Sequence, residues 1–265
     1  MDALDPLISA LHTEGRLRVW SLVITVFGDM VQQRGGRIST ARLGPLLGRV
    51  GVEPGAMRTA LSRLGNDGWV ESERKGRTSI YRLSTQGIHR FGPATERIYA
   101  PPRSTPVRRW AMAVKLGDGS AEPRLLPADE APADSDCMVV GEISTLSDAY
   151  RQSLLSAPYR DSLTALASDL DALAQIEPDD ALTAAAARML LIHRWRRIVL
   201  RFPELPAELM PDNAPLTRPR NAVANAYRRF WAASERWLDS EIGGQSGMPA
   251  ANGLQQNRFG MGLRG

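Results

Sequence analysis

The residues best suited to macromolecular recognition lie in one short segment of the chain. Arginine pairs bidentately with O6 and N7 of guanine, and short hydroxyl side chains let a helix approach base edges closely. One polar side of the segment from Glu53-Pro54 to about Gly68 carries these types at helical spacing. The pattern predicts that this segment is a DNA-recognition helix whose base-reading residues are Arg58, Thr59, Ser62 and Arg63.

A basic turn follows this helix directly. The β-rich runs WVESE and TSIYRL flank it, so the three together predict a charged hairpin. A recognition helix followed by such a hairpin is the layout of a winged helix-turn-helix, in which the wing holds the phosphate backbone. We therefore expect phosphate or minor-groove contacts from Arg74, Lys75 and Arg77, and from Arg42 on the preceding helix.

Each of these residues also has a simpler interpretation. The polar side of the helix is, taken alone, an ordinary solvated face, and charged hairpin tips are common. Arg63 has Asp67 four residues on, which is salt-bridge spacing within a helix. Arg42 is as readily a plain surface charge. The DNA-binding prediction depends on helix, turn and hairpin occurring together in this order.

The surrounding pattern supplies the elements that must position these residues. Apolar side chains recur at helical spacing over residues 16–36, and Gly35-Gly36 ends that helix. Ser39-Thr40 offer an N-cap to a second helix reaching about Val50, in which Pro45 implies a kink or a later start. Glu53-Pro54 begin the third helix. A fourth runs from Ser84-Thr85 to about Tyr99.

The rest of the chain divides into a β-containing middle and a helical end. Strands are expected at 109–114 and 137–143, where Cys137 would be a small hydrophobic residue, followed by helical patterns to the last helix at about 218–241. The predicted fold class is α+β and mainly helical. Its expected domains are a winged helix-turn-helix at 1–103, a middle domain at 104–178, a C-terminal helical domain at 179–243 and a disordered, Gly-, Gln- and Asn-rich tail at 244–265.

Composition narrows the function classes. A hydrophobic fraction of 43% and a charged fraction of 23% over 265 residues suit a folded protein of two or three domains. Basic residues outnumber acidic ones in 1–103 and 181–265, whereas acidic residues dominate 104–180. No apolar run approaches the roughly 20 residues of a membrane span, so we expect a cytoplasmic location. The lone cysteine and three scattered histidines predict no metal site, and no catalytic motif is found, so we expect neither cofactor nor enzyme activity.

Two motifs resemble the PaaX family of repressors of phenylacetate degradation. The pattern R-T-A-x-S-R-L-x-x-x-G-W fits Arg58 to Trp69, and G-R-x-S-x-Y-x-L-[ST]-x-x-G fits Gly76 to Gly87. The family's L-x-H-x-[WY]-R-R helix and following L-P loop are similar at 191–211, with Phe202 in place of the usual Asp. The resemblance covers most of residues 15–240. The middle segment is shorter than the ferredoxin-like domain usual there, so a shortened form of that domain is expected.

The resemblance implies a homodimer that represses a catabolic operon from a palindromic operator and is released by an aryl-CoA thioester such as phenylacetyl-CoA. A CoA thioester needs cationic groups for its phosphates and an aromatic surface for adenine. The candidates for effector binding are Trp110, His193, Arg194, Arg197, Tyr227, Arg228 and Trp231. Core packing or a surface ion pair is an equally good role for each of these candidates. The alternative to a repressor is a nonspecific architectural DNA-binding or scaffold protein with a C-terminal protein-interaction domain.

Overall fold

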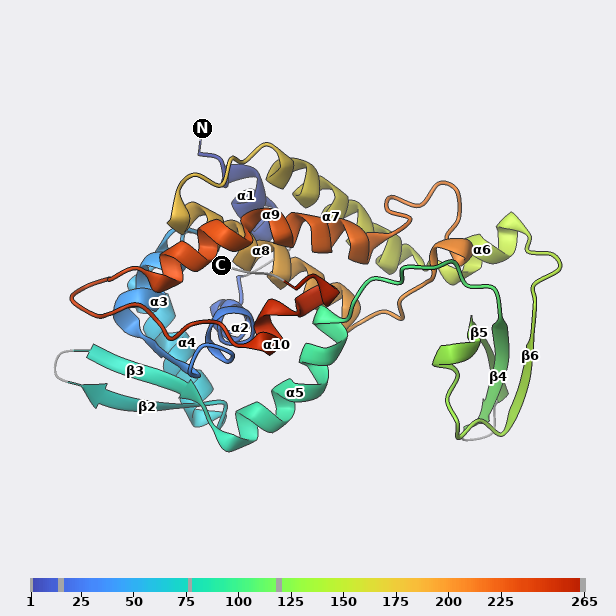
Figure 1. The fold of residues 1–265 in the computed structure, drawn as a ribbon, viewed down its shortest axis with the longest axis horizontal. Helices are drawn as coiled ribbons and strands as arrows, with labels where there is room; N and C mark the ends of the chain where they lie inside the picture. The colour runs from blue at the N-terminus through green and yellow to red at the C-terminus, as the bar shows by residue number, and fades with distance from the viewer. Residues whose placement is uncertain (1, 14–16, 76–77, 118–120, 263–265) are drawn as a thin grey trace. The chain divides into compact units, whose positions relative to one another are not determined.

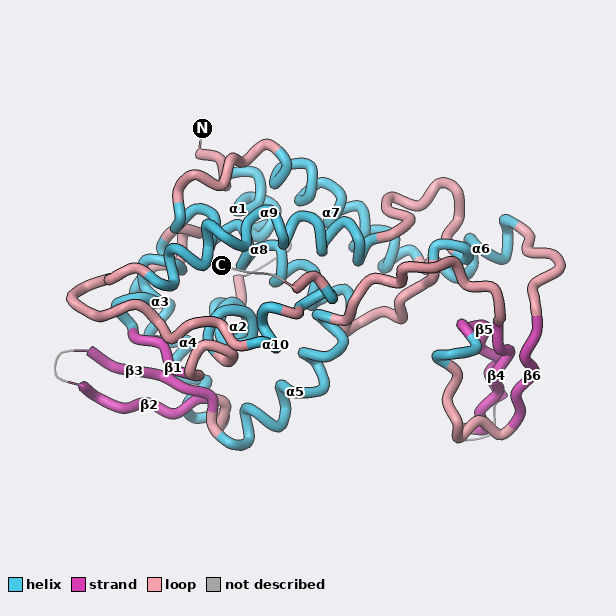
Figure 2. Tube along the Cα trace, in the orientation of Figure 1, coloured by secondary structure: helices cyan, strands magenta, loops and turns pink. Residues whose placement is uncertain are grey.

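The computed structural model describes residues 2–13, 17–75, 78–117 and 121–262 (Figure 1). It is mainly helical with two small antiparallel sheets, which confirms the predicted α+β class (Figure 2). Contacts divide the chain into two compact units. Unit 1 comprises residues 1–102, 162–203 and 219–265, and unit 2 comprises residues 103–161 and 204–218. Within the described ranges, every helix is too short or too polar to span a bilayer.

The N-terminal part of unit 1 has the element order helix, strand, helix, helix, strand, strand. A short helix, α1 (Asp5–Thr13), precedes it. Strand order in the sheet is β1-β3-β2, with antiparallel pairing throughout. This is the connectivity expected of a helix-turn-helix with a wing. The elements are α2 (Val19–Val26) with a π-helical turn (Phe27–Val31), β1 (Arg37–Ser39), α3 (Thr40–Gly48), α4 (Pro54–Asn66), β2 (Val70–Lys75), β3 (Thr78–Leu83) and α5 (Thr85–Tyr99).

Local sequence explains where these helices begin. The Ser39 side chain accepts a hydrogen bond from the Arg42 amide at the start of α3, as its N-cap position predicts. The later start that Pro45 suggested is therefore wrong, and α3 accommodates Pro45 in its interior. Ser84 caps α5 in the same way, accepting from the Gly87 amide at 2.9 Å. Gly51, with φ of 81°, makes the turn between α3 and α4.

The C-terminal helices of unit 1 pack with these elements instead of forming a separate domain. Helix α8 (Ala181–Val199) contacts α2, α3, α5 and α9 (Pro219–Asp239), and residues 184–195 of α8 are buried without a break. A helix that is buried on every side over this length must be enclosed by neighbours. This grouping differs from the expectation that residues 1–103 and 179–243 form two separate domains. Helix α7 (Ala157–Ala174) begins in unit 2 and continues into unit 1.

The predicted disorder of the tail is wrong for its described part. Residues 252–260 form a short helix, α10 (Gly253–Gln256), and a 3-10 turn (Arg258–Gly260). Arg258 and Phe259 are buried, and the Asn252 amide donates to the carbonyl of Gln33 at 3.2 Å. Composition favoured disorder because most of the segment is small or polar. Burial of Arg258 and Phe259, together with these hydrogen bonds, holds the segment against unit 1.

Unit 2 contains a three-stranded antiparallel sheet of order β5-β4-β6. Its strands are β4 (Trp110–Leu116), β5 (Ala121–Pro127) and β6 (Cys137–Gly141), and α6 (Asp148–Leu154) follows them. In the described part, no α-helix separates these strands, so the shortened ferredoxin-like domain, with its βαβ crossovers, is not what the structure has. Trp110 packs with Val107 and Leu209 in the core of this unit. Strand β6 is exposed along its length, including Cys137.

Candidate nucleic-acid interface

Helix α4 separates its apolar and polar residues sharply. Met57, Ala60, Leu61 and Leu64 are buried, which seats the helix against the unit. Proline in the first turn suits the helix start, where its missing N–H removes no intrahelical bond. The base-reading candidates all lie on the opposite, exposed side: Arg58, Thr59, Ser62 and Arg63.

The exposed residues differ in how far they are already engaged. The Thr59 hydroxyl donates to the Gly55 carbonyl at 3.1 Å. Arg63 lies 3.6 Å from the Asp67 carboxylate and over the Trp20 ring at 5.9 Å, so the intrahelical ion pair that the sequence allowed is formed. Arg58 is exposed and has no ion-pair partner among the described residues. It is therefore the basic side chain on this face most available to a ligand.

The wing is a twisted hairpin that presents charge on its strands. Arg74 is exposed, and its backbone pairs with Ser79. The Lys75 backbone pairs with Thr78, whereas the Lys75 side chain and the whole of Arg77 lie outside the described residues. Two further arginines on the sheet, Arg37 and Arg82, pair with Glu73 and Glu71 at 3.5 and 2.7 Å. A cavity of about 240 Å³ lies among these paired residues.

The assignment of Arg42 to the phosphate backbone is corrected by its position. Its side chain is buried, and its two terminal nitrogens donate to the carbonyls of Trp237 and Ser240 at 2.8 and 2.6 Å. The guanidinium also lies 5.5 Å from the centre of the Trp237 ring. Burial, and after it the neighbouring Arg34, lower the pKa of Arg42. Arg42 therefore joins α3 to the C-terminal end of α9, and DNA cannot reach it in this fold.

The proposed effector residues do not gather in one cavity. His193, Arg194 and Arg197 do line a common space, with Asp169, Leu7, Leu11 and Leu190, but its volume is about 10 Å³. Ligand pockets are typically ~300 Å³ or larger. The His193 ring shares a hydrogen bond of 3.0 Å with the Thr25 hydroxyl, and Arg194 lies 2.6 Å from the Asp169 carboxylate.

The aromatic members of the effector set are core residues instead. Tyr227 and Trp231 are buried in α9 and stack on the Arg188 guanidinium, whose centre lies 4.8 and 4.6 Å from their rings. They thus face Arg188. Arg228 is exposed on the same helix, and Trp110 belongs to the core of unit 2.

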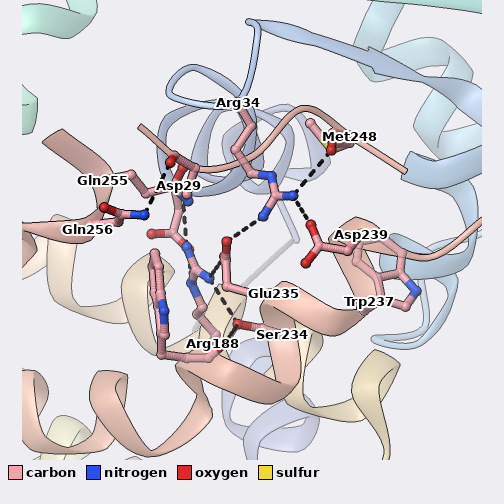
Figure 3. A network of polar contacts seen from close by, with 12 residues as sticks. Asp29, Arg34, Arg188, Ser234, Glu235, Trp237, Asp239, Met248, Gln255 and Gln256 are labelled. Carbon is pink, nitrogen blue, oxygen red and sulfur yellow. Dashed lines mark hydrogen bonds and ion pairs between the residues drawn. The ribbon is translucent and has the colours of Figure 1, made fainter. Parts of the chain in front are cut away.

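A buried charge network that sequence reasoning missed joins the π-helical turn after α2, and the residues just beyond it, to α8 and α9 (Figure 3). Arg188 donates to Asp29 and to Glu235, both at 2.7 Å, and Arg34 pairs with Glu235 and Asp239. Although burial by itself lowers the pKa of Arg188, the Asp29 and Glu235 carboxylates raise it above its usual value. One sequence signal was present: Asp29 and Arg188 each interrupt a long apolar run.

Comparison with known proteins agrees with this architecture. Residues 18–87 match the family model described as PaaX-like protein, and residues 145–240 match the model described as PaaX-like protein C-terminal domain. The chain is 27% identical to the transcriptional repressor PaaX of Escherichia coli (strain K12) over 285 aligned positions, covering 91% of this chain and 89% of that protein. A solved structure, the uncharacterised protein Rv0674 from Mycobacterium tuberculosis, is similar in fold, with a TM-score of 0.52 and 19% identity over 82% of this chain and 96% of that chain.

Fold and site together define a mainly helical α+β protein that presents an arginine-bearing helix and a charged hairpin on one unit. Both family matches occur in the expected order along the chain. The chain belongs to the PaaX family.

Proposed function

We propose that this protein is a ligand-responsive transcriptional repressor that binds a palindromic operator through α4 and the wing. The observation that carries the proposal is the division of α4, which buries Met57, Ala60, Leu61 and Leu64 while Arg58 and Ser62 remain exposed. A helix of this kind inserts into the major groove, and the following hairpin contacts the backbone. The similarity to a protein named as a transcriptional repressor supports the same function.

Replacing Arg58 with alanine tests the recognition helix. We expect operator affinity to fall about 5- to 150-fold, with relaxed preference at one base pair, because a bidentate Arg–guanine contact contributes roughly 1–3 kcal/mol. The measurement is a titration against DNA upstream of the protein's own gene and against random DNA. Arg124→Ala, which removes an exposed arginine from β5, is the charge-matched control. An unchanged operator affinity for Arg58→Ala would exclude this helix as the reader.

The same titration separates a repressor from a nonspecific architectural protein. A repressor binds its operator ~10³-fold or more above random DNA at physiological salt. Arg42→Ala offers a further comparison, because we expect it to reduce stability by about 1–3 kcal/mol through the unsatisfied carbonyls. It should leave the slope of log affinity against log salt unchanged, whereas the loss of one phosphate contact reduces that slope by about one.

A homodimer forms part of the proposal, since a palindromic operator needs two recognition helices related by twofold symmetry. Strand β6 supports it. It pairs with β4 on one side, and Met138, Val139 and Val140 are 47%, 65% and 39% exposed. An exposed apolar edge strand is a surface that proteins ordinarily cover.

Release by an aryl-CoA thioester such as phenylacetyl-CoA completes the proposal. The thioester must bind the DNA-incompetent state more tightly than the competent one. Linkage then requires that thioester and operator weaken each other's binding by the same factor. We expect phenylacetyl-CoA to lower operator affinity and operator DNA to lower phenylacetyl-CoA affinity equally, both measured by titration at fixed salt. Operator affinity that does not respond to any aryl-CoA would refute this class of effector.

A further inference from the structure

The described end of the chain, residues 248–262, lies against the π-helical turn that follows α2, and we call it the C-terminal arm. It lies beyond residues 145–240, which match the C-terminal family model. The Met248 amide donates to the Leu238 carbonyl at 2.9 Å, and the Gln255 side chain donates to the Asp29 carbonyl at 3.1 Å. Figure 3 shows Gln255 beside Asp29 on this side of the network. The arm thus contacts both α9 and the π-helical turn.

Arg258 of the arm enters a preformed set of acceptors. One terminal nitrogen donates to the Asp29 carbonyl and carboxylate at 2.5 and 2.6 Å, and the other donates to the Gly28 carbonyl at 2.7 Å. Tyr99 and Tyr227 donate to the same Asp29 oxygen at 2.8 and 2.9 Å. The guanidinium also lies 3.9 Å from the Tyr99 ring centre. We call these four residues, Gly28, Asp29, Tyr99 and Tyr227, the socket.

The next residue of the arm adds an aromatic contact. The Phe259 ring packs edge-on against Tyr99 and Tyr227, at centroid distances of 5.5 and 5.3 Å. Phe259 is 2% exposed. The socket therefore fits a guanidinium followed by an aromatic ring, held by a carboxylate, two carbonyls and two tyrosines.

Two unfavourable local conformations coincide here. Helix α2 continues into a π-helical turn at Phe27–Val31. This geometry is rare overall, and many of its occurrences are at functional sites. Phe259 has φ of 54°, a left-handed conformation that costs a bulky residue of order 1–3 kcal/mol. Such a backbone cost persists where the surroundings hold it in place, and the cost at Phe259 would be relieved if the arm left.

We propose that the socket is a binding site for an arginine–aromatic peptide segment, filled here by the chain's own arm, and that the arm docks and undocks as a unit. Docking stabilises the contact between α9 and the π-helical turn that follows α2. Undocking leaves Asp29 bonded to Arg188 and the two tyrosines, but removes the cation that also bonds the Gly28 carbonyl. This inference depends on the unit 1 fold and is independent of DNA binding.

The test uses the full chain with a specific protease site inserted between Gly243 and Gly244, in an exposed turn. After folding and cleavage, a fluorescent peptide with the sequence of residues 248–262 is added, and its binding is followed by anisotropy. We expect the peptide to replace the cleaved arm. An Arg258→Ala or Phe259→Ala peptide should bind about tenfold more weakly or worse, because charge-assisted hydrogen bonds or aromatic packing are lost.

A Leu254→Ser peptide is the matched control, since Leu254 is 73% exposed. It should bind within about twofold of the natural sequence, as surface substitutions usually do. Equal binding by the Arg258→Ala and natural peptides would overturn the proposal. So would a cleaved arm that never exchanges while the body stays folded.

A second measurement on the uncut chain covers the case in which cleavage unfolds the protein. In hydrogen exchange, amides of residues 252–261 should open together, at lower free energy than the amides of α8. Arg258→Ala should speed exchange in the arm and leave α8 protected. Arm amides that exchange only together with α8 would show that the arm is an integral part of the core and would overturn the proposal.

Discussion

Replacing Arg188 with methionine lowers the free energy of unfolding by about 3–5 kcal/mol, the usual cost of removing one partner from a buried ion pair. Both Arg188 and Asp29 are fully buried, and Glu235 is nearly so. The variant keeps much of the side chain's bulk but removes the guanidinium that Asp29 and Glu235 share, while Asp29 keeps Arg258 and Glu235 keeps Arg34. Tyr227 and Trp231 also lose their stacked cation. Such a loss is a large fraction of the roughly 5–15 kcal/mol that stabilises a typical protein.

Urea unfolding followed by tryptophan fluorescence measures this loss in unit 1, to which all tryptophans except Trp110 belong. Arg82→Ala is the control, because the Arg82–Glu71 pair is about half exposed and such pairs contribute roughly 0–1 kcal/mol. A double-mutant cycle with Glu235→Gln should give a coupling of about 0.5–3 kcal/mol. A loss for Arg188→Met no larger than for Arg82→Ala would contradict the buried network.

Acid reduces the stability of this protein through His193 by about 2–3 kcal/mol between pH 6.5 and 4.5, at 1.36 kcal/mol per pH unit. Burial, and after it the cations of Arg196 and Arg197, lower the pKa of His193 from its ordinary 6.5 to about 3. Between these two values the unfolded chain binds the proton and the folded chain does not. Stability is therefore complete above pH 6.5 and falls as the pH drops towards 3.

A His193→Gln variant separates the pH dependence of stability due to His193 from that due to neighbouring titratable groups. Burial raises the pKa of Asp169, which lines the same small cavity, to about 7, and that change acts in the opposite direction. Taking the difference in unfolding free energy between the two proteins removes the pH dependence of the groups that both contain, including that of Asp169. We expect the advantage of the natural protein over the variant to shrink by about 2–3 kcal/mol from pH 6.5 to 4.5. A difference that does not change with pH would show that the pKa of His193 is the same in the folded and unfolded states.

Sequence alone predicted the α4 face and the hairpin because local periodicity determines both. Met57, Ala60, Leu61 and Leu64 mark the buried side of α4 by spacing, and the polar side lies opposite them. The same logic applied to α3 would have placed Arg42 with Leu46, four residues on, on the buried side. The charge of Arg42 favoured a surface position instead, and that prediction is wrong.

The remaining features depend on partners far along the chain. Arg42 is buried because carbonyls nearly two hundred residues later accept its hydrogen bonds. The arm is ordered because Asp29, in the π-helical turn after α2, accepts hydrogen bonds from Arg258. No local pattern encodes such pairings. His193 and Arg197 line one small space beside α8, and the sequence could not show how little room that space has.

The π-helical turn at Phe27–Val31 has a consequence for how relatives should be aligned. Such a turn is equivalent to one amino acid inserted into an α-helix, and each inserted residue rotates the remainder of the helix by about 100°. In a homologue that lacks the inserted residue, the residue at position 34 would be rotated away from position 235 unless a nearby change compensated for the rotation. We therefore expect single-position gaps in this helix to covary with the residues at positions 34 and 235 across the family.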